Sequence, residues 1–265
     1  MEEKQNIHDI ARSTQLLRGR VALITGASRG IGAATARLLA WHGAAVGVNY
    51  NTNAVRAQEV VEAIRSEGGR AIAIQASVDD AKQLEVMAQR VERELGPIDT
   101  LVMNAVAVRK FGFAPVLESH WEMYQDIVMG ELAGVYFPAR VVAPLMVERK
   151  RGNLIAVSSL SARVARIGSS AHAAGKASVE AFMKVLAGEL GPHGVRVNVV
   201  APGLTRTEAS APMMQEWGES YSKMVPLRRV GQPEDVAGAI LLLATDEARY
   251  LTGNYLAVGG GNYMP

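Results

Sequence analysis

The chain has 265 residues, of which 49% are apolar and 20% charged, and its formal net charge is +2. This length suits one large α/β domain better than two small ones. Lys and Arg do not gather on one face, which argues against a nucleic-acid partner, and the absence of cysteine excludes disulfides and thiolate chemistry. We find no signal peptide and no apolar run approaching a membrane span, so we expect a cytoplasmic protein without membrane contact or a metal site.

Residues 1–18 are polar and predict a loosely held N-terminal arm, within which Ile7, Ile10, Ala11 and Leu16–Leu17 could form a short amphipathic helix. From residue 19 onward, short apolar runs alternate with longer amphipathic ones. The predicted strands are 20–25, 44–49, 70–75, 98–103, 152–158, 194–199 and 254–258. The predicted helices are 30–43, 53–67, 80–95, 118–148 (which could be broken), 170–191, 210–218 and 232–246.

Continuous apolar strands that alternate with helices predict a single α/β domain over residues 19–265. Its doubly wound parallel sheet would have about seven strands and helices on both faces. Residues 203–228 contain scattered Gly, Pro and Met without a clean period, and they predict a mobile flap over the site.

The stretch Thr25–Gly32 joins the first predicted strand to the first predicted helix. Gly26 permits a sharp turn, Gly30 lets the backbone approach a pyrophosphate, and Gly32 lets the helix pack close to its strand. Free N–H groups at the helix start would face the phosphate charge, so this stretch predicts a dinucleotide-binding element. The other contacts expected from it are Ser28, Arg29 and Ile31.

The second predicted strand ends in Val48–Asn53, which contains no acidic residue. A carboxylate there would bind the ribose hydroxyls of NAD and repel a 2′-phosphate, so its absence permits NADP. The guanidinium of Arg29 suits a phosphate, although Arg29 could also be a plain exposed turn residue. We therefore expect NADP(H) as the cofactor.

Further motifs follow in a specific order: Pro202-Gly203 with Thr207, Pro233–Ala237, Leu251–Gly253, and Val258–Gly261. With the glycine-rich turn, they resemble the short-chain dehydrogenase/reductase family along the whole chain from Arg20, although Gly259 stands where that family usually has Asp. The resemblance implies a Rossmann fold and a nicotinamide cofactor. The contacts that it implies outside the glycine-rich turn are Tyr50, Asn51, Ser77 (often Asp in the family), Val78, Asn104, Ala105, Val106, Lys176, Pro202, Gly203, Thr205 and Thr207.

The resemblance also implies a catalytic set of Asn, Ser, Tyr and Lys. Ser159 and Lys176 match it, whereas His172 stands at the Tyr position and Glu131 at the Asn position. Val106 replaces the last glycine of the usual Asn-Ala-Gly. We name Ser159, His172, Lys176 and Glu131 as the candidate catalytic residues.

His172 precedes Lys176 by one helical turn, on the same face. An imidazole ordinarily titrates near pH 6.5 and could donate a proton, but a neighbouring ammonium disfavours the imidazolium. Glu131 would offset this effect by pairing with Lys176 or His172 if it faced the site. Alternatively, His172 is a polar filler and Glu131 faces solvent or a subunit interface.

Ketone reduction makes an alkoxide and needs an acid, whereas conjugate reduction makes an enolate that needs hydrogen-bond donors more than a strong acid. With the tyrosine absent, reduction of a conjugated double bond (an enone or enoyl thioester) is narrowly favoured. The alternative is reduction of a ketone or β-keto thioester. A second alternative is a non-redox enzyme or a nucleotide-binding protein on the same scaffold.

The substrate pocket should be apolar and suit a small acyl, polyketide or terpenoid-like group, without a cationic cluster for an anionic head group. Its predicted walls are Val106, Phe111, Phe113, Met213, Met214 and Trp217, which could instead be flap packing. The resemblance implies a homotetramer or dimer formed through the helices near 118–148 and 170–191 and through the C-terminal segment.

Overall fold

The structure, a computed structural model, describes residues 15–264. All strand pairs are parallel, and the seven-stranded sheet has the order β3-β2-β1-β4-β5-β6-β7. The strands are β1 (Val21–Ile24), β2 (Ala45–Tyr50), β3 (Arg70–Gln75), β4 (Thr100–Met103), β5 (Gly152–Val157), β6 (Val195–Pro202) and β7 (Tyr255–Val258). The predicted Rossmann fold, with helices on both faces of a parallel sheet, is confirmed.

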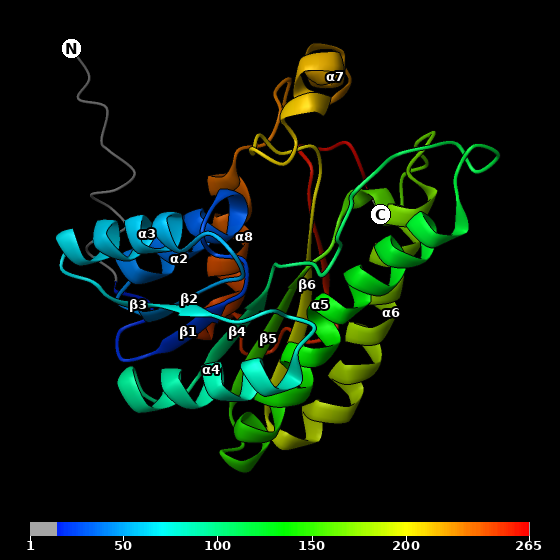
Figure 1. Cartoon of the computed structure of the whole chain (residues 1–265). Helices are drawn as coiled ribbons and strands as arrows, with labels where there is room; N and C mark the ends of the chain where they lie inside the picture. Colours follow the sequence, from blue (N-terminus) through cyan, green and yellow to red (C-terminus); the bar gives the residue numbers. More distant parts are fainter. Residues whose placement is uncertain (1–14, 265) are drawn as a thin grey trace, which may run out of the picture.

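The helices are α2 (Gly30–Trp41), α3 (Ala54–Ser66), α4 (Ala81–Glu94), α5 (Trp121–Glu148), α6 (Ser170–Leu190), α7 (Ala211–Met224) and α8 (Pro233–Ala244). Helices α2, α3 and α8 cover one face of the sheet, and α4, α5 and α6 cover the other (Figure 1). Three predicted bounds differ from the observed ones by three residues or more, and one of them is the end of the strand predicted at 194–199, which runs on to Pro202. The stretch 118–148 is one unbroken helix from Trp121 although it contains Pro138 and Pro144, and the helix predicted at 210–218 runs on to Met224.

The central strands are apolar throughout because both of their faces are buried. Successive side chains alternate between two fully buried clusters, with Leu23, Leu101 and Leu154 on one side and Ile24, Val102 and Ile155 on the other. This double burial explains why the sequence shows continuous apolar runs rather than alternation.

Helix α5 is long and apolar enough to cross a membrane by length and composition. Its side chains Ile127, Val142 and Met146 are nevertheless fully buried in the core, and it packs along α6. Within residues 15–264, α5 therefore has the position of a core helix.

The end of the predicted N-terminal arm is part of the core. Leu17 is 3% exposed, and its N–H donates to the carbonyl of His42 at 2.8 Å. The arm is therefore fixed at this point rather than loosely held, while Ile7, Ile10 and Ala11 lie outside the described residues.

The direction of strand progression reverses between β1 and β4, since β2 and β3 lie to one side of β1 and the later strands to the other. In such sheets the crevice at the carboxyl ends of the strands is where ligands bind. Helix α7 stands over this edge of the sheet (Figure 1).

Candidate active site

The glycine-rich turn is held against the end of β4. The side-chain N–H of Asn104 donates to the carbonyls of Thr25 and Gly26 at 3.0 and 3.2 Å. Gly26 has φ +63°, and a Cβ there would lie 3.0 Å from Cβ of Ala105. A Cβ at Gly32 would lie 2.5 Å from the carbonyl oxygen of Gly26, so only glycine permits this close packing of helix on turn.

The start of α2 has the features of an anion site. Its N-cap, Arg29, makes no side-chain capping bond, and the first turn contains no acidic residue. Gly30 has φ +55° and faces Thr207, to whose Cγ2 an added Cβ would come within 3.3 Å. The free N–H groups and the close approach of backbone fit a pyrophosphate, so the residues present suit the dinucleotide that the fold implies.

The other predicted cofactor residues lie at the same edge of the sheet. Tyr50 ends β2 and Asn51 follows it, Ser77 and Val78 follow β3, Asn104–Val106 follow β4, and Pro202–Thr207 end or follow β6. Sequence reasoning missed an ion pair here: Nη1 of Arg56 on α3 lies 2.6 Å from Oε1 of Glu208 beyond β6. Its partners are 152 positions apart, so no local pattern signals it.

A buried carboxylate joins two of the candidate catalytic residues. Oε1 of Glu131 on α5 lies 2.9 Å from Nδ1 of His172, and Oε2 lies 2.8 Å from Nζ of Lys176, both on α6. Lys176 also donates to the carbonyl of Val157 at the end of β5, at 2.9 Å. Glu131 is only 2% exposed, so it faces neither solvent nor an exposed surface.

Glycines let α5 and α6 approach closely around this carboxylate. A Cβ at Gly175 would lie 2.9 Å from Cβ and Cγ of Glu131. About one turn further along α5, a Cβ at Gly134 would lie 2.3 Å from the carbonyl oxygen of Ala105. The close approach that Gly175 and Gly134 permit therefore places Glu131 between the loop after β4 and the turn of α6 that carries His172.

Burial opposes ionisation of Glu131, but Lys176 and His172 outweigh this effect and hold the pKa of its carboxyl below the ordinary value. An ionised carboxylate only accepts hydrogen bonds, so the shared hydrogen is on Nδ1 of His172. Within residues 15–264, no hydrogen bond engages Nε2 of that ring. This nitrogen is therefore the one that can exchange a proton with a ligand.

Ser159 lies two residues beyond Val157. Its Oγ accepts from the N–H of Ser161 at 3.2 Å and thereby caps the short helix Leu160–Ala162. In the described part of the chain, no hydrogen bond joins Ser159 to His172. The structure thus brings three of the four candidate catalytic residues into direct contact and places the fourth on the adjoining segment.

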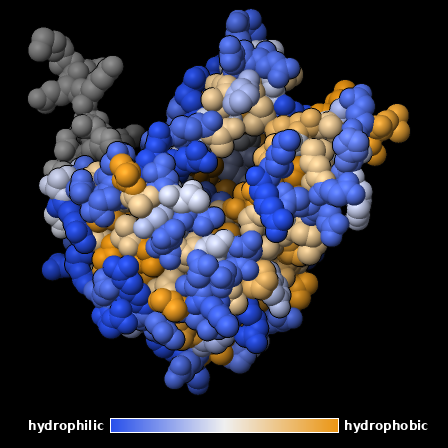
Figure 2. Space-filling view, in the orientation of Figure 1, coloured by the Kyte–Doolittle hydropathy of each residue, from blue (hydrophilic) through white to orange (hydrophobic). Residues whose placement is uncertain are grey.

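Aromatic side chains form the wall beside His172. The ring centroids of Phe111 and Phe113 lie 5.2 and 6.2 Å from that of His172. Arg166 contacts both Phe113 and, on α7, Trp217 and Met213. Figure 2 shows the hollow between α7 and the loop after β4. Met214 and Trp217 also pack against the cluster of Tyr221, Val225 and Val230 within the flap, as the alternative of flap packing expects.

A guanidinium lies among these apolar walls. Cζ of Arg166, from the loop between β5 and α6, lies 3.4 Å from the centroid of the Trp217 ring and 5.4 Å from that of Phe113. Sequence reasoning missed Arg166. Its only signal in the sequence is a cation in the segment between the strand predicted at 152–158 and the helix predicted at 170–191.

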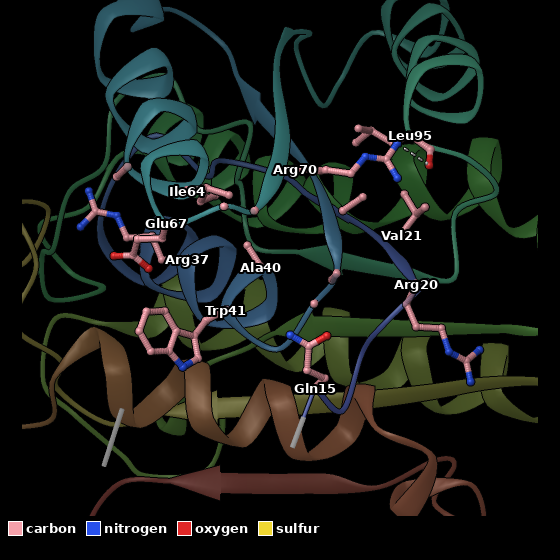
Figure 3. Close-up of a pocket in the computed structure, with 17 residues that line it drawn as sticks. Gln15, Arg20, Val21, Arg37, Ala40, Trp41, Ile64, Glu67, Arg70 and Leu95 are labelled. Carbon is pink, nitrogen blue, oxygen red and sulfur yellow. Dashed lines mark hydrogen bonds between the residues drawn. The ribbon is translucent and has the colours of Figure 1, made fainter. Parts of the chain in front are cut away.

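A separate cavity of about 510 Å³ opens at the opposite edge of the sheet, where β1, β2 and β3 begin. Gln15, Arg37, Trp41, Glu67 and Arg70 are among its lining residues (Figure 3). It contains none of the predicted site residues.

Comparison with known proteins agrees with this fold. Residues 26–262 match the family described as "Enoyl-(Acyl carrier protein) reductase". The chain is 39% identical over 249 residues to the 3-oxoacyl-[acyl-carrier-protein] reductase of Synechocystis, covering 94% of this chain and 98% of that protein.

Two solved structures are similar over nearly the whole chain. A short-chain type dehydrogenase/reductase from Mycobacterium marinum has a TM-score of 0.88 and 33% identity, covering 96% of this chain and 100% of that chain. A 7α-hydroxysteroid dehydrogenase complexed with NADH and 7-oxo glycochenodeoxycholic acid has a TM-score of 0.87 and 31% identity, covering 94% and 96%.

The fold and the glycine-rich turn define a nicotinamide-dependent oxidoreductase. The chain belongs to the short-chain dehydrogenase/reductase family.

Proposed function

We propose that this protein is an NADP(H)-dependent carbonyl reductase that acts on a ketone of the 3-oxoacyl thioester class, with His172 as the proton donor. The observation that carries the proposal is the 2.9 Å contact between Glu131 and Nδ1 of His172. The sequence favours conjugate reduction only because the acidic tyrosine of the family is absent. The His172–Glu131 pair can supply an acid in its place, and the name of the Synechocystis relative, a 3-oxoacyl reductase, supports the carbonyl substrate.

His172 stands where the family has its tyrosine, and we assign it that residue's role. Nε2–H donates a proton to the carbonyl oxygen, while NADPH, when bound, supplies the hydride to the carbonyl carbon. Glu131 fixes the tautomer and orientation of the ring and stabilises its protonated form. After product release, Nε2 recovers a proton from water, so the pair returns to its starting state.

Lys176 and Ser159 complete the proposed site. An ammonium has three N–H donors. Two of the donors of Lys176 face the carbonyl of Val157 and Oε2 of Glu131, which leaves the third for a ribose hydroxyl. The hydroxyl of Ser159 donates to Oγ of Ser161 at 3.2 Å, and on substrate binding it would rotate to donate to the substrate oxygen while it still accepts from the N–H of Ser161. The first of these groups positions the cofactor, and the second positions the carbonyl.

NADP(H) is proposed over NAD(H) on two observations. No acidic residue ends or follows β2 at Tyr50 and Asn51, where a carboxylate would repel a 2′-phosphate. Arg29 is exposed at the start of α2, where its guanidinium can pair with that phosphate.

We also propose that the protein assembles as a homotetramer or dimer through α5 and α6. Tyr136 of α5 and Val185 of α6 are 44% and 61% exposed, although their helices pack side by side. A second copy would cover this apolar face. Analytical ultracentrifugation of the wild type and a Val185→Lys variant tests this assembly.

The deciding experiment follows NADPH oxidation with matched 3-oxoacyl and 2-enoyl thioesters and identifies the products by mass. A 3-hydroxyacyl product supports carbonyl reduction. A saturated product from the enoyl substrate instead supports the second candidate, conjugate reduction, which the description of the matching family favours. Tight NADPH binding without turnover of either substrate would point to a non-redox protein.

A further inference from the structure

Arg166 makes no direct contact with a carboxylate in the described part of the chain. Within residues 15–264 it takes part in no ion pair, and its one hydrogen bond runs from Nη1 to the sulfur of Met213, a weak acceptor, at 3.4 Å. Partial burial among apolar side chains lowers the pKa of Arg166, and this effect outweighs the opposing charge of Glu216. The guanidinium has therefore lost part of its hydration without a hydrogen-bonded counter-charge to replace it.

The geometry leaves the binding edge of this guanidinium available. Its Cζ is 3.4 Å from the centroid of the Trp217 ring, so a face of the guanidinium is used by the cation–π contact. Its five N–H donors lie in the guanidinium plane, where a carboxylate can accept two of them in parallel. Only the weak bond to Met213 now uses one of these donors.

Arg166 and the proposed proton donor line one continuous wall. Phe113 separates them: its ring centroid is 5.4 Å from Cζ of Arg166 and 6.2 Å from the centroid of the His172 ring. A backbone hydrogen bond from the N–H of Ala114 to the carbonyl of Gly168, at 3.0 Å, joins the loop that carries Phe113 to the loop that carries Arg166. The spacing between the two groups is therefore built into the fold.

We propose that Arg166 binds a carboxylate at the far end of the substrate, so that the preferred substrate is an oxo compound with a short apolar chain between its ketone and its carboxylate. This inference rests on the proposed carbonyl reduction. His172 acts at the ketone, Phe113 packs against the chain, and Arg166 holds the anionic end. The apolar walls alone predict a purely apolar substrate, and Arg166 changes that prediction.

The test uses two 3-oxoacyl thioesters of one neutral thiol. They are identical except that one ends in a free carboxylate and the other in its methyl ester. The wild type should prefer the acid by about tenfold or more in kcat/KM, which corresponds to about 1.4 kcal/mol. Arg166→Gln should bring the ratio of the two kcat/KM values close to one, and Arg166→Lys should restore part of the preference.

Arg163→Gln is the matched control. Arg163 belongs to the same loop, but its Nε already lies 3.0 Å from Oε2 of Glu180. The ratio for this variant should equal that of the wild type, even if its overall activity falls. A wild type that turns over acid and ester equally well would overturn the inference while leaving carbonyl reduction intact.

A binding measurement separates this inference from the proposed function. Trp217 touches the guanidinium, so its fluorescence should respond when glutarate is titrated into the NADP⁺-loaded protein. The response should be absent in Arg166→Gln. It should also be absent in Trp217→Phe, which would show that the signal does not come from the other two tryptophans. If glutarate binds but neither thioester is turned over, carbonyl reduction is refuted and the anion site is supported. If the wild type shows no saturable response to glutarate, the anion site is refuted.

Discussion

Oε1 of Glu131 lies 2.9 Å from Nδ1 of His172, although the two residues are 41 positions apart in the chain. A histidine that is oriented by a carboxylate is a common device for moving a proton at a defined atom. The sequence leaves the role of His172 open, and this contact supports the proposal that His172 donates a proton.

Replacement of His172 by Gln should remove the proton donor but keep a polar side chain. We expect kcat/KM for a 3-oxoacyl thioester to fall about 100-fold or more, because general acid catalysis typically contributes a factor of this size. Stopped-flow or steady-state NADPH oxidation measures the change.

His193→Gln is the control for this prediction, since His193 is exposed in a short helix beyond α6. Its kcat/KM should match that of the wild type. If His172→Gln reduces the ketone at the wild-type rate, another group donates the proton, and the role proposed for His172 is wrong.

Glu131→Gln should destabilise the fold in a pH-dependent way. In the fold, the carboxyl of Glu131 has a pKa below its ordinary value of 4.5. Its ionisation therefore stabilises the native state above about pH 4.5, and this contribution is lost as the pH falls through the folded-state pKa. At neutral pH we expect a loss of about 3 kcal/mol, because Lys176 stays buried without its counter-charge. Urea unfolding should show a smaller loss near pH 4, and a constant difference at both pH values would contradict this linkage.

Gly175→Ala tests whether close helix packing positions Glu131. The new Cβ would lie 2.9 Å from Cβ and Cγ of Glu131 and 3.3 Å from Cα of Val128. We expect a destabilisation of about 1–3 kcal/mol from overpacking, despite the better helix propensity of alanine. Activity should fall as well, because the carboxylate must shift away from His172.

Gly188→Ala provides the matched comparison in the same helix. An added Cβ at Gly188 meets nothing within 4 Å. This variant should be more stable than the wild type by about 0.4–1 kcal/mol and equally active. Equal behaviour of the two alanine variants in thermal unfolding would mean that the site tolerates movement of α5 against α6.

The sequence predicts the sheet well and the site only in part. Leu23 and Ile24 illustrate why, since buried parallel strands leave an apolar signature in the local sequence. The contact between Glu131 and His172 has no such signature, because it depends on how α5 and α6 pack. Arg166 was missed for the same reason: only the folded chain shows that Trp217, rather than water, faces its guanidinium.

Arg29→Ala tests the preference for NADP(H). Loss of a guanidinium that pairs with the 2′-phosphate should raise the Kd for NADPH about tenfold, in line with a charge-assisted hydrogen bond of roughly 1.5 kcal/mol. The Kd for NADH should stay the same, because NADH lacks that phosphate. Isothermal titration with both cofactors measures this, and an equal rise in both Kd values would show that Arg29 does not discriminate between them.

Tyr255→Phe should make the protein more resistant to alkali. Burial raises the pKa of Tyr255 from 10.0 to about 12, and within residues 15–264 its hydroxyl has no hydrogen-bond partner. The phenol therefore stays neutral in the fold while it ionises in the unfolded chain, so wild-type stability falls as the pH rises from 10.0 to about 12. The variant lacks this contribution, and its free energy of unfolding should decline less over that range.

Tyr250→Phe is the control, since Tyr250 is 98% exposed and its removal should leave the alkaline decline unchanged. An identical decline in wild type and Tyr255→Phe would show that this phenol ionises freely in the native state.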